Sequence, residues 1–212
     1  MKLPLRSARL ALASLLITAC NGRTDYANPG APPPASARTR TIGDSRLTVW
    51  RRAIAAIGKT GTIIESMDEG AGVVAVSVGG DPEQFLDCGH ITSIVEDPRG
   101  TRTYAFPAAR AAQRYERASG LGQIVTVERR MSFSARLNIV FEAYGPQQTT
   151  ITVSGTYLVQ RLRLARDGSD PGATDSTRFT SDTTGSFPNL DGRTISCVST
   201  GKLEQDMLNA AR

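Results

Sequence analysis

Histidine is almost absent from this chain, and cysteine is limited to three residues. His90 is the only histidine among 212 residues, whereas a metal site needs several Cys or His ligands at short spacings. A serine hydrolase would have to use His90, and the sequence has no Gly-x-Ser-x-Gly elbow to support one. It also lacks a phosphate-binding loop and a Gly-x-Gly-x-x-Gly fingerprint after a strand. The sequence therefore predicts a non-enzymatic protein with no catalytic residue, no metal site and no cofactor.

Long hydrophobic runs are missing as well. The clearest apolar run, Leu10–Ile17, is too short for a bilayer core of ~30 Å, which takes about 20 apolar residues. It follows the basic residues Lys2, Arg6 and Arg9 and precedes Thr18-Ala19-Cys20, which is the order of a signal peptide. Residues 16–20, Leu-Ile-Thr-Ala-Cys, resemble the lipobox of bacterial lipoproteins. The resemblance implies that residues 1–19 are removed and that Cys20 carries a diacylglyceryl group and an acyl chain such as palmitate.

The residue after the lipobox cysteine bears on the destination. In proteobacterial lipoproteins, Asp at this position is the usual signal for retention in the inner membrane, and this chain has Asn21. The resemblance therefore implies a lipid-anchored protein of the outer membrane that faces the periplasm, with the inner membrane as the alternative.

Lysine is scarce, but the chain is rich in arginine. The formal net charge is +5, and it falls to +2 when the three basic residues of residues 1–19 are removed. A charge this small is weak evidence for a nucleic-acid partner, and a protein outside the cytoplasm would not meet the genome. We therefore expect no nucleic-acid binding.

Two regions follow the signal peptide. Residues 20–43 comprise the predicted lipidated cysteine and a stretch rich in Pro, Gly, Ala, Ser and Thr, which predicts a tether without a core of its own. Residues 44–212 are long enough for a single domain with a real core. We expect this to be the periplasmic domain.

The domain begins with a helix and two strands. Leu47, Trp50, Ile54 and Ile57 form one apolar stripe after a cap at Asp44 or Ser45, and Gly58 or Gly61 ends the helix. Two β-branched runs then flank a turn at residues 68–72. Residues 44–80 resemble the helix-grip modules of BamC-type outer-membrane lipoproteins, of the β-barrel assembly machinery. The resemblance implies architecture only and assigns no functional residue.

The strongest pattern is a period-two alternation over residues 124–144, which predicts a half-buried antiparallel strand. Because 21 residues would span about 70 Å, we expect a break at Ser134–Arg136. Residues 149–164 return after a turn at Gly145-Pro146, with a change of apolar phase near Gln160 that suggests a β-bulge. Residues 166–177 read as a polar loop, and a helix over residues 199–209 closes the chain. The predicted class is α+β: an antiparallel sheet with long strands and with the N-terminal and C-terminal helices packed on one face, as in a helix grip.

Cys88 and Cys197 remain once Cys20 is assigned to lipid. Two thiols in an oxidising compartment are most simply a disulfide. The alternative is a nucleophilic Cys88 assisted by His90, which lies on the same face of an extended strand.

Charge is segregated along the chain, with acidic residues in residues 60–97 and 167–191 and arginines in residues 98–166. One interpretation is that these blocks pair across the fold. The other is a polar surface that binds a charged partner. If residues 108–118 are helical, Arg110, Arg114 and Arg117 share a face and form a patch for an anionic partner.

These features favour a non-enzymatic envelope lipoprotein, bound to the membrane through Cys20. Its domain is predicted to be an interaction module for an envelope protein or for anionic lipid headgroups. Two alternatives remain open: a carrier of an apolar ligand in a cavity between helix and sheet, and an enzyme built on Cys88 and His90.

Overall fold

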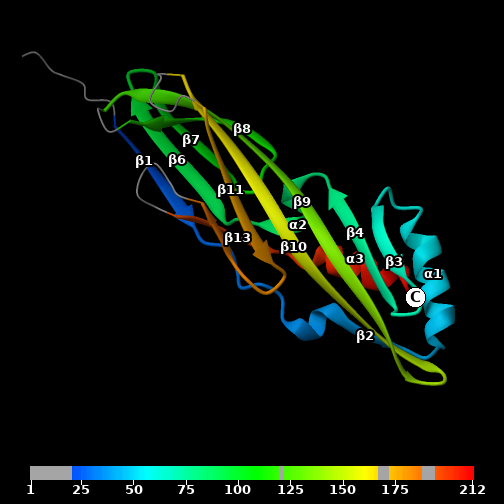
Figure 1. The fold of residues 1–212 in the computed structure, drawn as a ribbon. Helices are drawn as coiled ribbons and strands as arrows, with labels where there is room; N and C mark the ends of the chain where they lie inside the picture. The colour runs from blue at the N-terminus through cyan, green and yellow to red at the C-terminus, as the bar shows by residue number, and fades with distance from the viewer. Residues whose placement is uncertain (1–20, 120–121, 167–171, 188–193) are drawn as a thin grey trace, which may run out of the picture.

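Antiparallel β-sheets dominate the computed structural model, which describes residues 21–119, 122–166, 172–187 and 194–212 (Figure 1). The largest sheet of the described residues has seven strands. They are β2 (Thr39–Ile42), β3 (Ile63–Asp68), β4 (Val73–Gly79), β8 (Ala112–Ala118), β9 (Ile124–Gly145), β10 (Gln148–Ala165) and β11 (Ala173–Thr180).

The long hairpin β9–β10 is the backbone of this sheet. The two strands pair with each other from the Gly145 turn to Ala165, and shorter strands line their outer edges. β8 and β4 follow one another along β9, while β11 and β2 follow one another along β10. β3 pairs with β4. The hairpin therefore runs the whole length of an elongated domain (Figure 1).

Different layers cover the two ends of the hairpin. At one end lies a sheet of β1 (Asn21–Ala27), β6 (His90–Asp97) and β7 (Gly100–Pro107). The helices α1 (Arg46–Ile57) and α3 (Lys202–Ala210) lie at the other end (Figure 1). We call these the β1 end and the helix end. The remaining elements are η1 (Ala35–Arg38), α2 (Pro82–Phe85) and a small sheet of β5 (Leu86–Asp87), β13 (Ile195–Ser199) and β12 (Gly185–Phe187).

The fold corrects the predicted class. The described residues are mainly β, with 58% in strands and 16% in helices, and they do not form the α+β helix-grip fold that the resemblance to BamC-type modules implies. One reason lies in residues 98–118, for which no strand is predicted. They form β7 and β8 instead, and β8 extends the large sheet along β9.

Residues 21–42 also differ from the expected tether. Asn21–Ala27 pair with β6 along their whole length, and Thr39–Ile42 pair with β10. Tyr26 donates a hydrogen bond from its hydroxyl to the carbonyl oxygen of Ser196, at 3.0 Å. The small and polar side chains of this stretch offer little core of their own, so its order comes from pairing with strands far away in the sequence. The folded domain thus includes strands within residues 21–42, which are predicted to belong to the tether.

The predicted N-terminal helix is confirmed. Ser45 is its N-cap and accepts a hydrogen bond from the backbone N–H of Thr48, and Gly58 is its C-cap. Its apolar side packs on the large sheet, where the Trp50 ring meets Phe141 edge to face at 5.2 Å between centroids. The closing helix also forms, although it begins at Lys202 rather than at residue 199.

The alternation over residues 124–144 is confirmed, but the break predicted at Ser134–Arg136 is wrong. β9 is one strand from Ile124 to Gly145, and its buried side chains keep to odd positions throughout. At ~3.3 Å per residue it is about 70 Å long. The domain accommodates this length by being elongated and by covering the two halves of β9 with different layers.

The change of phase predicted near Gln160 is wrong as well. Odd positions of β10 stay buried up to Arg163, so Arg161 and Arg163 point into the interior, and Leu162 and Leu164 lie on the more open face. The prediction failed because it followed the apolar residues instead of the strand period. Arg129 on β9 is buried in the same way.

Candidate functional site

The cysteine pair forms as predicted. A disulfide joins Cys88, directly after β5, to Cys197 in β13 across 109 positions. It connects the early strands to the segment before α3. For a loop near 100 residues, the chain-entropy model gives a stabilisation of about 4.7 kcal/mol, through the lost entropy of the unfolded chain. Because the disulfide occupies the Cys88 sulfur, the thiol required by the hypothesis of a Cys88 and His90 enzyme is not free.

The predicted lipidation site, Cys20, lies outside the described residues, as do residues 1–19. The next residue, Asn21, is the first of β1 and is the register partner of Glu96 in β6. The residue after the predicted lipid attachment point is therefore already paired within a sheet.

The arginine patch predicted on a helix does not form in that way, because residues 112–118 are the strand β8. Arg114 and Arg117 point to opposite faces of this strand. Arg110 precedes it and makes an ion pair with Glu83 at 3.4 Å. Sequence spacing placed the three side chains together only under the assumption of a helix.

The acidic and basic blocks of the sequence do pair across the fold. The ion pairs that join the blocks include Glu65–Arg136 at 2.9 Å, Glu83–Arg110, Asp97–Arg102 at 2.9 Å and Arg161–Asp175 at 2.7 Å. This confirms the interpretation that segregated charge along the chain is neutralised between neighbouring strands.

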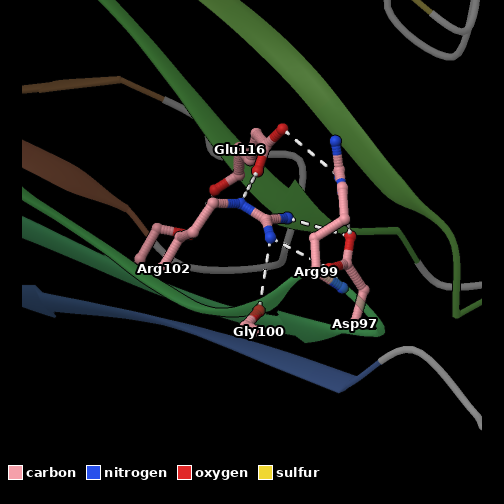
Figure 2. Close-up of polar contacts among 6 residues, drawn as sticks. Asp97, Arg99, Gly100, Arg102 and Glu116 are labelled. Carbon is pink, nitrogen blue, oxygen red and sulfur yellow. Dashed lines mark hydrogen bonds and ion pairs between the residues drawn. The ribbon is translucent and has the colours of Figure 1, made fainter.

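A polar network closes the β1 end of the domain (Figure 2). Arg102 of β7 bonds Asp97 at 2.9 and 3.0 Å and Glu116 of β8 at 2.6 Å. Arg99 adds further hydrogen bonds to Asp97 at 2.6 and 2.9 Å. The hydrogen bonds from Arg102, followed by those from Arg99, lower the pKa of Asp97 well below its usual range. The network joins the β6–β7 turn to the edge of the large sheet.

Other contacts bring the same segments together at this end. Ser93 of β6 donates its hydroxyl proton to the carbonyl oxygen of Glu116 at 2.7 Å. A Cβ on Gly22 would lie 3.0 Å from the Cβ of Ala118 and 3.0 Å from the carbonyl oxygen of Ile94, so β1 passes directly against β8. The start of β1, the β6–β7 turn and the end of β8 therefore lie side by side.

Three arginines lie in the interior between the sheets, and sequence reasoning missed this cluster. Arg161 and Arg163 both donate from Nη2 to Asp175 of β11, at 2.7 and 3.1 Å, and Arg161 lies 4.6 Å from the centroid of the Phe187 ring. Arg129 is 2% exposed, and within the described residues its Nε and Nη1 have no hydrogen-bond partner. Burial, followed by the charge of Arg161, lowers the pKa of Arg129 to about 10. We call Arg129, Arg161 and Arg163 the arginine cluster.

A second buried network ties α3 to the sheet. Glu204 accepts hydrogen bonds from the hydroxyls of Tyr157 at 2.8 Å and Ser181 at 2.6 Å, and Ser199 donates to Tyr157 at 2.9 Å. Burial, followed by the charge of Glu204, raises the pKa of Tyr157. These side chains are enclosed in the core, so this Ser, Tyr and Glu arrangement orients α3 and does not face a substrate.

The hollows on the surface of the described residues include two that bear on ligand binding. One, of about 540 Å³, lies between α1, α3 and β4 at the helix end. Its lining includes the apolar side chains Val78, Phe85, Leu203, Met207 and Ala210. The other, of about 480 Å³, lies on the outer face of the large sheet and is lined by polar groups including Arg136, Arg178 and Glu65.

The described residues contain neither a metal-binding cluster nor a membrane-spanning helix. No group of three or more His, Cys, Asp or Glu side chains in them is arranged to hold a metal ion. Their helices are all too short or too polar to cross a membrane.

Comparison of the sequence with protein-family models gives no match, and comparisons with curated proteins and with solved structures give none either. The proposed function therefore rests on the sequence and the fold of this chain.

Proposed function

We propose that this protein is a non-enzymatic lipoprotein of the bacterial envelope. In this proposal Cys20 carries the lipid, the β domain faces the periplasm from the outer membrane, and the domain binds another envelope component. Candidate partners are an envelope protein or anionic lipid headgroups.

The observation that carries this proposal is the meeting of the lipobox with the first strand. Residues 16–20 have the lipobox pattern, and Asn21 of β1, the residue after the predicted lipidation point, is already paired with Glu96 of β6. Cleavage before Cys20 would therefore leave the described fold intact. The Cys88–Cys197 disulfide adds support, because such bonds persist in oxidising compartments such as the periplasm.

Intact-mass analysis of the full chain expressed in a Gram-negative host tests the anchor. We expect a mature protein that begins at Cys20 and carries a diacylglyceryl and an acyl group. When lipoprotein signal peptidase is inhibited, the uncleaved precursor should accumulate. Cys20→Ala is the matched variant and should carry no lipid. A wild-type mass that fits cleavage elsewhere, or no lipid, would refute the proposal.

Fractionation tests the destination. The wild-type protein should sediment with the outer membrane, and Asn21→Asp should shift it to the inner membrane. Asn21 is exposed but lies opposite Glu96, so an unfolding midpoint close to that of the wild type is needed to confirm that the variant is folded. Crosslinking and pull-down of the lipidated protein, with Cys20→Ala as the control, should then recover an envelope partner that depends on anchoring.

The hollow between α1, α3 and β4, which we call the groove, favours a second candidate function, the carriage of an apolar ligand. Its volume of about 540 Å³ falls within the usual range for ligand sites. A fluorescent fatty acid that brightens in apolar surroundings should bind saturably to the wild type. Ala56→Trp should fill the groove and abolish binding, while Ala55→Trp, on the exposed side of α1, should not. No binding to the wild type would refute this function.

A further inference from the structure

We propose that the β1 end contacts the lipid bilayer directly and that the domain extends from it as a rigid body, with the helix end projecting into the periplasm. This inference depends on the proposed lipid at Cys20. It adds a membrane-contacting surface, an orientation and a fixed distance between the bilayer and the groove.

The residue that follows the proposed anchor already belongs to the fold, so no flexible segment separates the described fold from Cys20. β1 pairs with β6 from its first residue, Asn21 opposite Glu96, to its last, Ala27 opposite His90. Consecutive Cα atoms are 3.80 Å apart, so a lipid on Cys20 holds Asn21 within about one residue of the headgroup region. A flexible tether of residues 21–43 would have allowed a reach of about 25–30 Å.

Packing and hydrogen bonds hold the surface that would meet the bilayer rigid. Gly22 packs against Ala118, which fixes the start of β1 to β8. The β6–β7 turn is held by the hydrogen bonds of Arg99 and Arg102 to Asp97, and Arg102 also binds Glu116 (Figure 2). The anchor therefore positions the end of the domain as one body.

The β1 end carries exposed polar side chains. Arg99 is 68% exposed, and Arg23 and Arg166 are exposed nearby. Arg166 belongs to this end because its backbone N–H bonds the carbonyl oxygen of Thr126, near the start of β9. Exposed guanidinium groups suit contacts with lipid phosphates. This end fits the headgroup layer and not the hydrocarbon core.

The β9–β10 hairpin extends from the β1 end to the helix end. β9 starts at the β1 end and reaches the helix end about 70 Å away. The groove between α1 and α3 lies in the helix end, so a partner or ligand would meet it tens of ångströms from the anchoring bilayer.

Energy transfer from the protein to the membrane tests this arrangement. The lipidated full-length protein is placed in vesicles of phosphatidylethanolamine and phosphatidylglycerol that carry an acceptor dye on a headgroup. A donor dye is attached to a cysteine introduced by Thr101→Cys at the β1 end, Ser154→Cys midway along β10, or Gln147→Cys in the far turn. All three positions are exposed. Unfolding midpoints close to that of the wild type confirm that each variant is folded.

We expect transfer to fall in the order Thr101, Ser154, Gln147, with a severalfold difference between the first and the last. A Gly/Ser linker of about 20 residues between Cys20 and Asn21 has a reach of ~25 Å, and it should lower transfer from position 101 severalfold. Equal transfer from the three positions, the reverse order, or no effect of the linker would overturn the inference.

The mass of the same preparation separates the two proposals. A preparation without lipid on Cys20 refutes the proposed function and this inference with it. A lipidated preparation with flat or reversed transfer refutes this inference alone, and the lipoprotein assignment stands.

Discussion

Arg129 on β9 and Arg163 on β10 are direct register partners, and both side chains lie inside the domain. Like charges opposite one another on neighbouring strands destabilise a sheet. Asp175 binds Arg163 and Arg161, and within the described residues it has no hydrogen bond to Arg129. Arg129 is thus the side chain of the cluster that costs the most stability.

Replacing Arg129 by Met should stabilise the protein. The pKa of Arg129 is lowered to about 10, so at neutral pH its charge opposes folding by an amount on the order of 3 kcal/mol. For wild type, this penalty should fade as pH rises above about 10, because the folded state releases the proton before the unfolded state does. Urea unfolding at pH 7 measures the gain. Arg130→Met, on the exposed face of the same strand, is the control and should change stability by less than about 0.5 kcal/mol. A loss of stability in Arg129→Met would show that its charge is compensated.

Replacing Asp175 by Asn should destabilise the protein by about 2–4 kcal/mol, because two buried guanidinium groups lose a shared carboxylate. The free energy of unfolding from urea titrations measures the loss. The matched control is Asp25→Asn, which removes an ion pair with Arg23 whose two side chains are more than half exposed. It should cost less than about 1 kcal/mol. Equal losses in both variants would contradict the burial argument.

The Asp97 network should make the stability of the fold decrease at acidic pH. The pKa of Asp97 is lowered in the folded protein, so its contribution is fully present above about pH 4, its unfolded value, and is lost as pH falls toward the folded pKa. Unfolding midpoints measured from pH 7 down to pH 2 should therefore decline less in Asp97→Asn than in the wild type. The exposed neighbour Glu96→Gln should keep the wild-type slope. An unchanged slope in Asp97→Asn would argue against the network.

Tyr26 distinguishes an ordered β1 from a tether. Its hydroxyl donates to the carbonyl oxygens of Cys88 or Ser196 and accepts from the N–H of Ser196, all at 2.9–3.0 Å. Tyr26→Phe should lower the free energy of unfolding by about 1–2 kcal/mol. Tyr144→Phe, at a site that is 78% exposed in the far turn, should have no measurable effect. An unchanged free energy of unfolding in Tyr26→Phe would contradict an ordered β1 and favour the predicted tether instead.

Sequence reasoning succeeded where one element has a strong period of its own. α1 and β9 are predictable because their apolar residues recur at helical and strand spacings. β1 is not, since Asn21–Ala27 are mostly small or polar and gain order only from β6. The same limit applies to β8, whose arginines and alanines also suit a helix.

The site features divide in the same way. The Cys88–Cys197 pair follows from counting cysteines once Cys20 is set aside. The arginine cluster follows from the strand period of β10, but only if period is weighed above residue type, because Arg161 and Arg163 occupy positions that normally hold apolar residues. The pairing of Arg102 with Glu116 depends on how β7 meets β8, which the charge blocks alone do not specify.

The direction of β1 has a mechanical consequence. The strand enters at the outer end of the domain and runs inward along β6, parallel to the long axis of the hairpin. A force applied at Asn21 and directed outward along that axis would load the cross-strand hydrogen bonds of β1 together, in shear, instead of opening them one at a time. Because β9 and β10 continue through the whole domain, the load would pass to the helix end without crossing a hinge.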